Sequence, residues 1–132
     1  MTPVKSLAAD AAHAALEADP RAVLIDVRDP VEFSFVGHPV GAVNVPWKFA
    51  PEMRPNPEFV EQVSQIIADK ATPLFLLCRS GQRSLAAANV LAEAGYTDLT
   101  NVEEGFEGPM DAAKHRNTVA GWRFHQLPWV QS

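Results

Sequence analysis

The stretch "PLFLLCRSGQRSLAAANVLAEAG", residues 73–95, joins an apolar run to a helical pattern through a short polar loop. Its first part, "PLFLL", has the continuous apolar character of a strand that is buried on both faces. Residues 84–94 then predict a helix that stops at Gly95. A buried strand that leads directly into a helix is the repeating unit of α/β proteins with a parallel sheet.

The remainder of the chain repeats this unit. Further strands are predicted at "AVLIDV" (22–27), "AVNVP" (42–46) and "DLTNV" (98–102). A helix is predicted over 7–17, after an N-cap at Ser6, and another over 57–69, after Asn56. A third is predicted to begin at Asp29 and Pro30, where Glu32 completes a capping box. A short helix is also predicted over 109–113. Strands alternating with helices predict an α/β fold, with a small central parallel β-sheet flanked by helices on both faces.

The chain has 132 residues, which suits one domain that buries a core without disulfides or metal. No linker divides it, so we expect a single domain over residues 1–132. Residues 109–132 lack periodicity and hold two of the three tryptophans, Trp122 and Trp129. We expect this C-terminal extension to pack on the body through its aromatic side chains.

Composition argues against several classes of partner. The net charge of −5 gives no basic footprint for nucleic acid, and no apolar stretch approaches the roughly 20 residues of a membrane span. The N-terminal residues include acidic side chains, unlike a signal peptide, so we expect a cytoplasmic location. A single cysteine excludes an internal disulfide, and His13, His115 and His125 show no ligand spacing, so we expect no metal and no other cofactor. Either a monomer or a homodimer fits the composition.

The loop "CRSGQRS", residues 78–84, holds the only cysteine at the carboxyl end of a predicted strand. Ligands of open parallel sheets bind outside these strand ends. Loop N–H groups, the helix dipole and two arginines together favour an anion there, and Gly81 allows the tight turn. This field favours a thiolate, so Cys78 is the candidate nucleophile, although a buried structural cysteine is the alternative. The candidate anion-binding residues are Arg79, Ser80, Gly81, Gln82, Arg83 and Ser84.

This loop resembles the active-site loop of the rhodanese (sulfurtransferase) family. Three further segments resemble family motifs in the expected order and spacing: "LIDVRDPVEF" (24–33), "GHPVGAVNVP" (37–46) and "NVEEGFEG" (101–108). The resemblance thus covers residues 24–108. It departs from the family pattern at His38-Pro39-Val40, where His-Ile-Pro is more usual, and at Glu104, where glycine is commoner.

The resemblance implies a rhodanese-like fold and a ping-pong sulfur transfer like that of thiosulfate:cyanide sulfurtransferases. The Cys78 thiolate would attack the outer sulfur of a small anionic donor, such as thiosulfate, a polysulfide or a persulfide. The resulting Cys78 persulfide would be held by the loop and would pass its sulfur to cyanide, a small thiol or a protein thiol. The covalent persulfide takes the place of a cofactor.

Two alternatives remain open. A persulfide carrier that delivers sulfur to a protein partner would use the same cysteine, whereas regulatory binding modules of this family generally lack it. A cysteine phosphatase or arsenate reductase also places a cysteine and an arginine around an anion. Phosphatases have five residues between the two, whereas four separate Cys78 from Arg83, which makes a cradle small for tetrahedral phosphate.

Other residues are assigned to support or to the pocket wall. Structural support is expected from Asp26 and Arg28 as an ion pair, from Glu32 as a partner of Arg28, and from His38 as a hydrogen-bonded strut and not a general base. The candidate pocket walls are Trp47, Glu104 and Phe106. If Glu103 and Glu104 face the pocket, they would oppose a dianionic donor.

Overall fold

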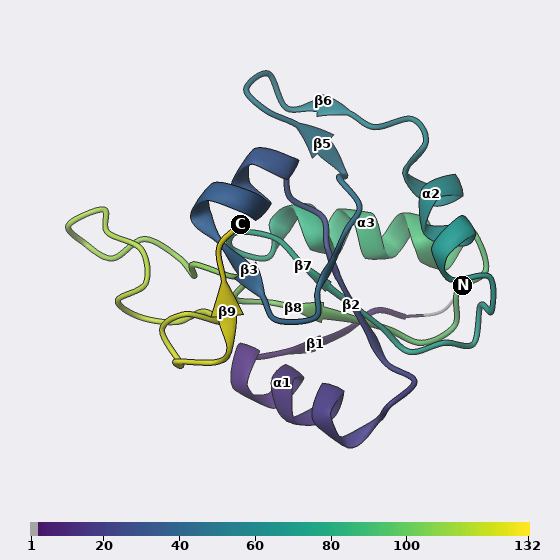
Figure 1. Ribbon diagram of the computed structural model, residues 1–132, viewed down its shortest axis with the longest axis horizontal. Coiled ribbons are helices and arrows are strands. Elements are labelled where there is room, and N and C mark those ends of the chain that lie inside the picture. The colour runs from purple at the N-terminus through teal and green to yellow at the C-terminus, as the bar shows by residue number, and fades with distance from the viewer. Residues whose placement is uncertain (1–2) are drawn as a thin grey trace.

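The computed structural model describes residues 3–132, which form a five-stranded sheet in the order β1-β8-β7-β2-β4 (Figure 1). The strands are β1 (Lys5–Leu7), β2 (Val23–Asp26), β4 (Val43–Asn44), β7 (Leu74–Leu77) and β8 (Leu99–Val102). Every neighbouring pair is parallel. All four residues of the central strand β7 are buried, as its unbroken apolar run predicted.

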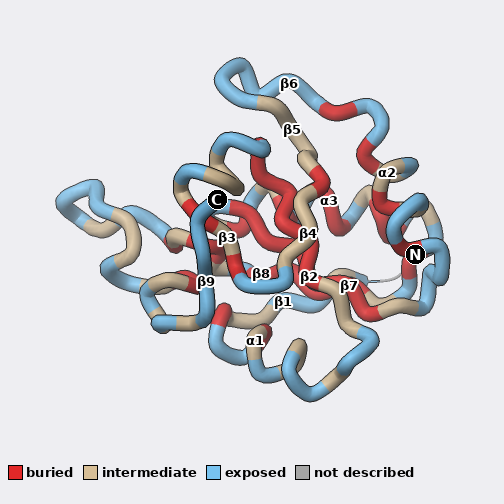
Figure 2. Tube along the Cα trace, viewed as in Figure 1, coloured by how far each residue is buried: buried red, intermediate tan, exposed pale blue. Residues whose placement is uncertain are grey.

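Helices cover both faces of this sheet, which confirms the predicted fold. Helix α1 (Ala9–Ala18) lies on one face, and α2 (Phe59–Ile66) and α3 (Gln82–Glu93) lie on the other (Figure 1). Side chains of β7 alternate between the two layers: Phe75 and Leu77 pack with α1, whereas Leu74 and Leu76 pack with α2 and α3. The buried residues accordingly run through the middle of the molecule along the sheet (Figure 2).

The cap signals mark the starts of two helical segments. Asn56 Oδ1 accepts a hydrogen bond from the Glu58 N–H at 3.1 Å, just before α2. Asp29 Oδ1 accepts from the Val31 N–H at 2.8 Å, and Glu32 Oε1 accepts from the Asp29 N–H at 3.3 Å, as in the predicted capping box. The segment that follows is a single wide turn of π-helix, η1 (Glu32–Val36).

Two local expectations are wrong. Ser6 does not cap a helix: it lies in β1, where it pairs with Asn101, and α1 begins only at Ala9. The short helix expected over 109–113 is absent, because the Asp111 carboxylate accepts the N–H groups of Ala113 and His115, both at 2.9 Å, and closes a turn instead.

Short antiparallel pairs complete the fold. The hairpin of β5 (Lys48–Phe49) and β6 (Arg54–Pro55) projects from the top of the molecule in Figure 1. Strand β9 (Trp129–Val130) returns to pair with β3 (His38–Pro39), so the C-terminal segment lies beside η1 (Figure 1). Within this segment Trp122 is buried, and its Nε1–H donates to the Pro128 carbonyl at 2.9 Å. Within residues 3–132, no helix combines the length and the apolar character needed to cross a bilayer.

Candidate active site

Cys78 lies between the end of β7 and the start of α3, and its side chain is buried. Its Sγ atom accepts hydrogen bonds from the Gly81 N–H at 3.1 Å and from the Ser84 hydroxyl at 3.3 Å. Donors aimed at a sulfur stabilise negative charge on it. The loop geometry therefore suits an anionic sulfur at this position.

Ser84 is oriented by residues on the neighbouring strand. Its Oγ atom lies 2.5 Å from Asn101 Oδ1 and 3.2 Å from the Gly81 carbonyl. The Asn101 amide in turn donates to that same carbonyl at 3.1 Å. Because a hydroxyl carries one proton, these two oxygens compete with the sulfur of Cys78 for it. The sequence analysis did not identify Asn101 as a site residue. The signal that could have identified it is its polar side chain within the predicted strand 98–102.

The segment 103–108 packs tightly under the loop. The Phe106 N–H donates to the Cys78 carbonyl at 2.8 Å, and the Glu107 N–H donates to the Arg79 carbonyl at 3.0 Å. Gly105 has φ +70°, and a Cβ there would lie 2.5 Å from the Arg79 carbonyl oxygen. Gly81, at φ +105°, would likewise press a Cβ into the backbone of the same segment. Both glycines are thus required by close backbone contact around the cysteine.

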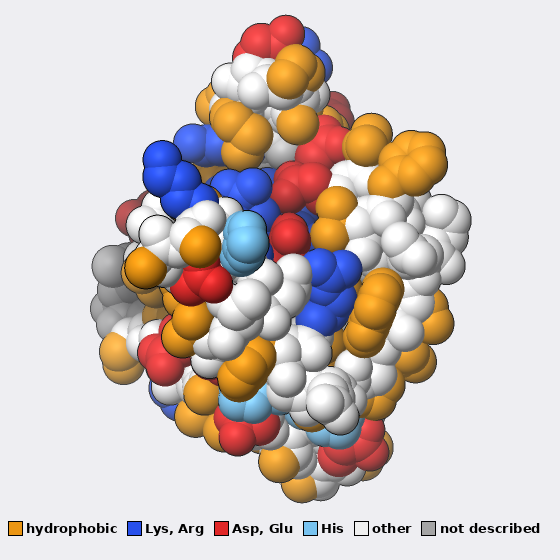
Figure 3. All heavy atoms as spheres, turned by 90° about the vertical axis from the view of Figure 1, so that its left-hand side faces the viewer, with side chains coloured by type: hydrophobic (Ala, Val, Ile, Leu, Met, Phe, Trp, Pro, Cys, Tyr) orange, Lys and Arg blue, Asp and Glu red, His pale blue; other side chains and the backbone are white. Residues whose placement is uncertain are grey.

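A pocket of about 490 Å³ opens beside the loop. It is lined by residues of η1, the β5–β6 hairpin, the loop and the segment after β8: Glu32, Val36, Ala50, Met53, Arg79, Arg83 and Glu107. Figure 3 shows this side of the molecule, with basic and acidic side chains gathered in the hollow below the projecting hairpin. The pocket therefore combines both signs of charge with an apolar rim.

The Arg83 guanidinium forms two hydrogen bonds with the Glu32 carboxylate, at 2.7 and 3.0 Å. Burial raises the pKa of Glu32, but the hydrogen bonds and charge of Arg83 outweigh it, so the pKa lies below its ordinary value. Burial lowers the pKa of Arg83, but Glu32 outweighs that effect and raises it. Both members of the pair are therefore charged at neutral pH.

The expected pair between Glu32 and Arg28 is wrong, because Arg28 has another partner. Its guanidinium donates to Asp26 at 2.6 and 2.9 Å and to the Gly37 carbonyl at 2.6 Å, and both side chains of the pair are fully buried. The same guanidinium lies 4.6 Å from the centre of the Phe106 ring. The expected ion pair of Asp26 with Arg28 is thus present, and it links the end of β2 to the Gly37 carbonyl.

The remaining sequence-predicted residues lie away from the pocket lining. His38 Nδ1 is 2.9 Å from the Phe33 carbonyl oxygen, consistent with a strut. Trp47 packs edge-to-face on Phe59 in the core, and Phe106 is fully buried. Besides Glu32, the pocket is lined by one more acidic residue, Glu107, which the sequence pattern did not single out.

Glu104 lies at the start of α1 and not in the pocket lining. Its Oε1 atom accepts the Ala9 N–H at 2.6 Å and lies 3.4 Å from His125 Nε2. With Asp10 these side chains form the one group of metal-ligand types found within residues 3–132, with atoms no more than 4.8 Å apart. The partial positive charge of a helix N-terminus disfavours a cation there, so the group is better described as a helix cap.

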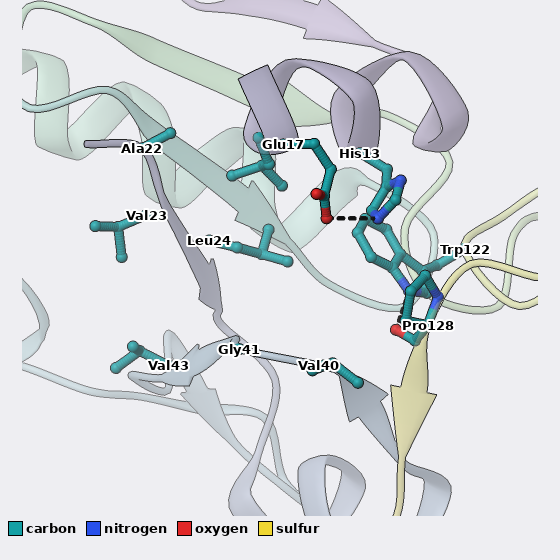
Figure 4. Close-up of a pocket in the computed structure, with 11 residues that line it drawn as sticks. His13, Glu17, Ala22, Val23, Leu24, Val40, Gly41, Val43, Trp122 and Pro128 are labelled. Atoms are coloured by element: carbon teal, nitrogen blue, oxygen red, sulfur yellow. Dashed lines mark hydrogen bonds and ion pairs between the residues drawn. The ribbon is translucent and has the colours of Figure 1, made fainter. Parts of the chain in front are cut away.

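A second cavity, of about 510 Å³, lies on the α1 side of the sheet (Figure 4). Most of its lining side chains are apolar, among them Leu24, Val43 and Trp122, and its polar side chains are His13 and Glu17, which lie 3.3 Å apart. No residue of the Cys78 loop lines it. This cavity is therefore separate from the cysteine loop, whereas Arg79 and Arg83 of the loop line the first pocket.

Comparison with known proteins identifies the family. The family model for a rhodanese-like domain matches residues 8–111. The crystal structure of Rv0390 from M. tuberculosis is 37% identical with a TM-score of 0.88, over 99% of this chain and 100% of that one. Thiosulfate sulfurtransferase 16, chloroplastic, from Arabidopsis thaliana is 40% identical over 84 residues, 62% of this chain and 68% of its own.

A further relative, the thiosulfate:glutathione sulfurtransferase of Saccharomyces cerevisiae, is 38% identical over 84 residues, which are 62% of this chain and 60% of that protein. The family match includes strands β2, β4, β7 and β8 of the sheet, the cysteine loop and the segment packed beneath it. The chain therefore belongs to the rhodanese-like family.

Proposed function

We propose that the protein is a sulfurtransferase that carries a sulfane sulfur as a persulfide on Cys78. The observation that carries this proposal is the setting of the Cys78 Sγ atom, which accepts the Gly81 N–H at 3.1 Å and lies 3.3 Å from the Ser84 hydroxyl. Donors in this position can stabilise negative charge on the sulfur during attack and in the persulfide that follows. The names of two relatives, both thiosulfate-dependent sulfurtransferases, support the same chemistry.

The proposed reaction has two steps. The Cys78 thiolate attacks the outer sulfur of thiosulfate, a new S–S bond forms, and the donor's S–S bond breaks so that sulfite leaves with the bonding electron pair. The enzyme then holds an anionic persulfide. Cyanide or the thiolate of an acceptor attacks the terminal sulfur, and the electron pair of the breaking S–S bond returns to the Cys78 sulfur.

The first turn of α3 offers donors for the terminal sulfur. The N–H groups of Gln82, Arg83 and Ser84 donate to no protein acceptor in the described part of the chain. Free N–H groups at a helix N-terminus, reinforced by the helix dipole, are a common binding site for anions. We expect these groups to hold the charge of the persulfide.

The ion pair of Arg83 with Glu32 argues against the alternative of phosphoryl or arsenate chemistry. An arginine that stabilises a tetrahedral dianion must present its guanidinium to that ligand. Here Nη1 and Nη2 of Arg83 both donate to the Glu32 carboxylate. Turnover of an aryl phosphate, without sulfur transfer from thiosulfate, would reverse this preference.

Intact-mass measurement tests the proposal. Wild type and Cys78→Ser are incubated with thiosulfate, and we expect a gain of one sulfur atom in the wild type alone, together with release of sulfite. A gain in both proteins, or in neither, would contradict it. Transfer from the loaded protein to glutathione or cyanide, compared with transfer to protein thiols, then separates an enzyme for small acceptors from a sulfur carrier.

A further inference from the structure

The pocket beside the loop contains balanced charges. Its lining holds two cations, Arg79 and Arg83, and two anions, Glu32 and Glu107. The side chains of the Arg83–Glu32 pair are 16% and 21% exposed, so solvent screens their mutual attraction only in part. The bidentate contact removes most of the net charge of Arg83 from the field that a pocket ligand experiences.

The other two charges do not restore a strongly positive field. Arg79 is exposed, and its side chain makes no hydrogen bond or ion pair with residues 3–132. Glu107 also lines the pocket, and its nearest basic partner is Arg123, 4.0 Å away. Arg123 does not line the pocket and lies against the rings of Phe106 and Trp129. A ligand in the pocket thus meets one free arginine together with an acidic residue.

We propose that Glu32, acting through its pair with Arg83, determines donor specificity by charge, favouring monoanionic sulfur donors such as thiosulfonates and organic persulfides over dianionic thiosulfate. The proposal rests on the proposed function for the chemical class of its ligands. The physical reason is that the Coulomb energy of a ligand scales with its charge. A second negative charge gains little in a balanced pocket and still has to lose its hydration.

Two donors isolate this effect. Thiosulfate and methanethiosulfonate present the same outer sulfur, but a methyl group replaces one oxygen, so their charges are −2 and −1. With either donor the Cys78 thiolate forms one S–S bond and the donor's S–S bond breaks. The leaving group is sulfite from the first donor and methanesulfinate from the second. The charge on the donor is therefore the main variable.

Binding is measured by isothermal titration calorimetry in a Cys78→Ser background, so that no sulfur is transferred. Glu32→Gln keeps the shape of the side chain and removes its charge. Because the two donors differ by one unit of charge and Glu32 is only partly exposed, we expect the ratio of the two dissociation constants to shift about tenfold toward thiosulfate. Glu32→Asp, which keeps the charge, and Glu61→Gln, the same change on an exposed position of α2, should leave the ratio unchanged.

The outcomes separate this inference from the proposed function. An unchanged ratio in Glu32→Gln, an equal shift in Glu32→Asp, or no binding of either donor to any variant would overturn charge selection by Glu32. If the ratio shifts as expected while the wild type gains no sulfur from either thiosulfate or methanethiosulfonate in the mass measurement, the charge selection stands and the proposed sulfur transfer falls. Circular dichroism of each variant confirms that the fold is intact.

Discussion

Replacing Gly105 by alanine should disturb the cysteine loop from below. A Cβ at this position would lie 2.5 Å from the carbonyl carbon and oxygen of Arg79 and 2.6 Å from the Cys78 carbonyl oxygen. Ordinary contacts of this kind are near ~3.4 Å, so the backbone has to move by about 0.9 Å, at a cost of about 1–3 kcal/mol. The left-handed conformation, φ +70°, adds about 1–2 kcal/mol for a residue with a side chain.

Gly41→Ala provides a matched control for this change. Gly41 also has a positive φ, +84°, but a Cβ added there would meet no atom within 4 Å. Gly41→Ala should therefore lower the free energy of unfolding only through the left-handed backbone conformation. Gly105→Ala should lower it by about 2 kcal/mol more, because its Cβ also clashes with the backbone. In urea denaturation this difference corresponds to a midpoint lower by about 1 M.

The same substitution should impair sulfur loading. The Phe106 N–H, directly after Gly105, donates to the Cys78 carbonyl, so movement of this segment displaces the nucleophile. A displacement near 1 Å typically costs about 10- to 100-fold in rate. If Gly105→Ala is no less stable than Gly41→Ala and gains sulfur from thiosulfate at the wild-type rate, the close packing of 103–108 does not position the loop.

Three more predictions concern buried or partly buried polar contacts. Asp26→Ala should lower the free energy of unfolding by about 3–5 kcal/mol, because it leaves the buried charge of Arg28 without its carboxylate. A loss below about 1 kcal/mol in urea denaturation would contradict this. Ser84→Ala should slow sulfur gain at Cys78 by about tenfold or more in timed mass measurements, since it removes one of the two donors to Sγ, and an unchanged rate would exclude that role. The pKa of Glu32 is lowered by folding, so its stabilisation is full above the unfolded-state pKa of about 4.3 and is lost as pH falls through the lower folded-state value. Urea denaturation between about pH 3 and 6 should therefore show a shallower acid loss of stability in Glu32→Gln than in wild type, and equal slopes would refute this.

The sheet and the position of the loop could be predicted because their signals are local. The runs at 22–27 and 73–77 are apolar enough to predict strands that are buried on both faces. The order of strand, loop and helix then places residues 78–84 at the carboxyl end of a parallel strand. No knowledge of distant contacts is needed for that step.

The partners of the charged residues could not be predicted in the same way. Arg28 and Arg83 are both plausible partners for Glu32, and the choice depends on how η1 packs against the loop, 51 positions further along the chain. The turn at Gly105 likewise decides which acidic residue lines the pocket: Glu104 lies at α1, whereas Glu107 lies beside the loop. Strand β1 was missed because three residues carry too little pattern, and its partner is β8.

The sheet order also has a consequence for how the chain folds. Ile25 pairs with Val43 across 18 residues and Leu74 with Leu99 across 25, whereas Val23 pairs with Leu74 across 51 and Lys5 with Thr100 across 95. Closing a longer loop costs more entropy and slows folding. We therefore expect the units β2–β4 and β7–α3–β8 to form early and the edge strand β1 to join late. On this route the turn that holds the cysteine belongs to the folding nucleus, so changes within it would alter the rate of folding as well as the chemistry.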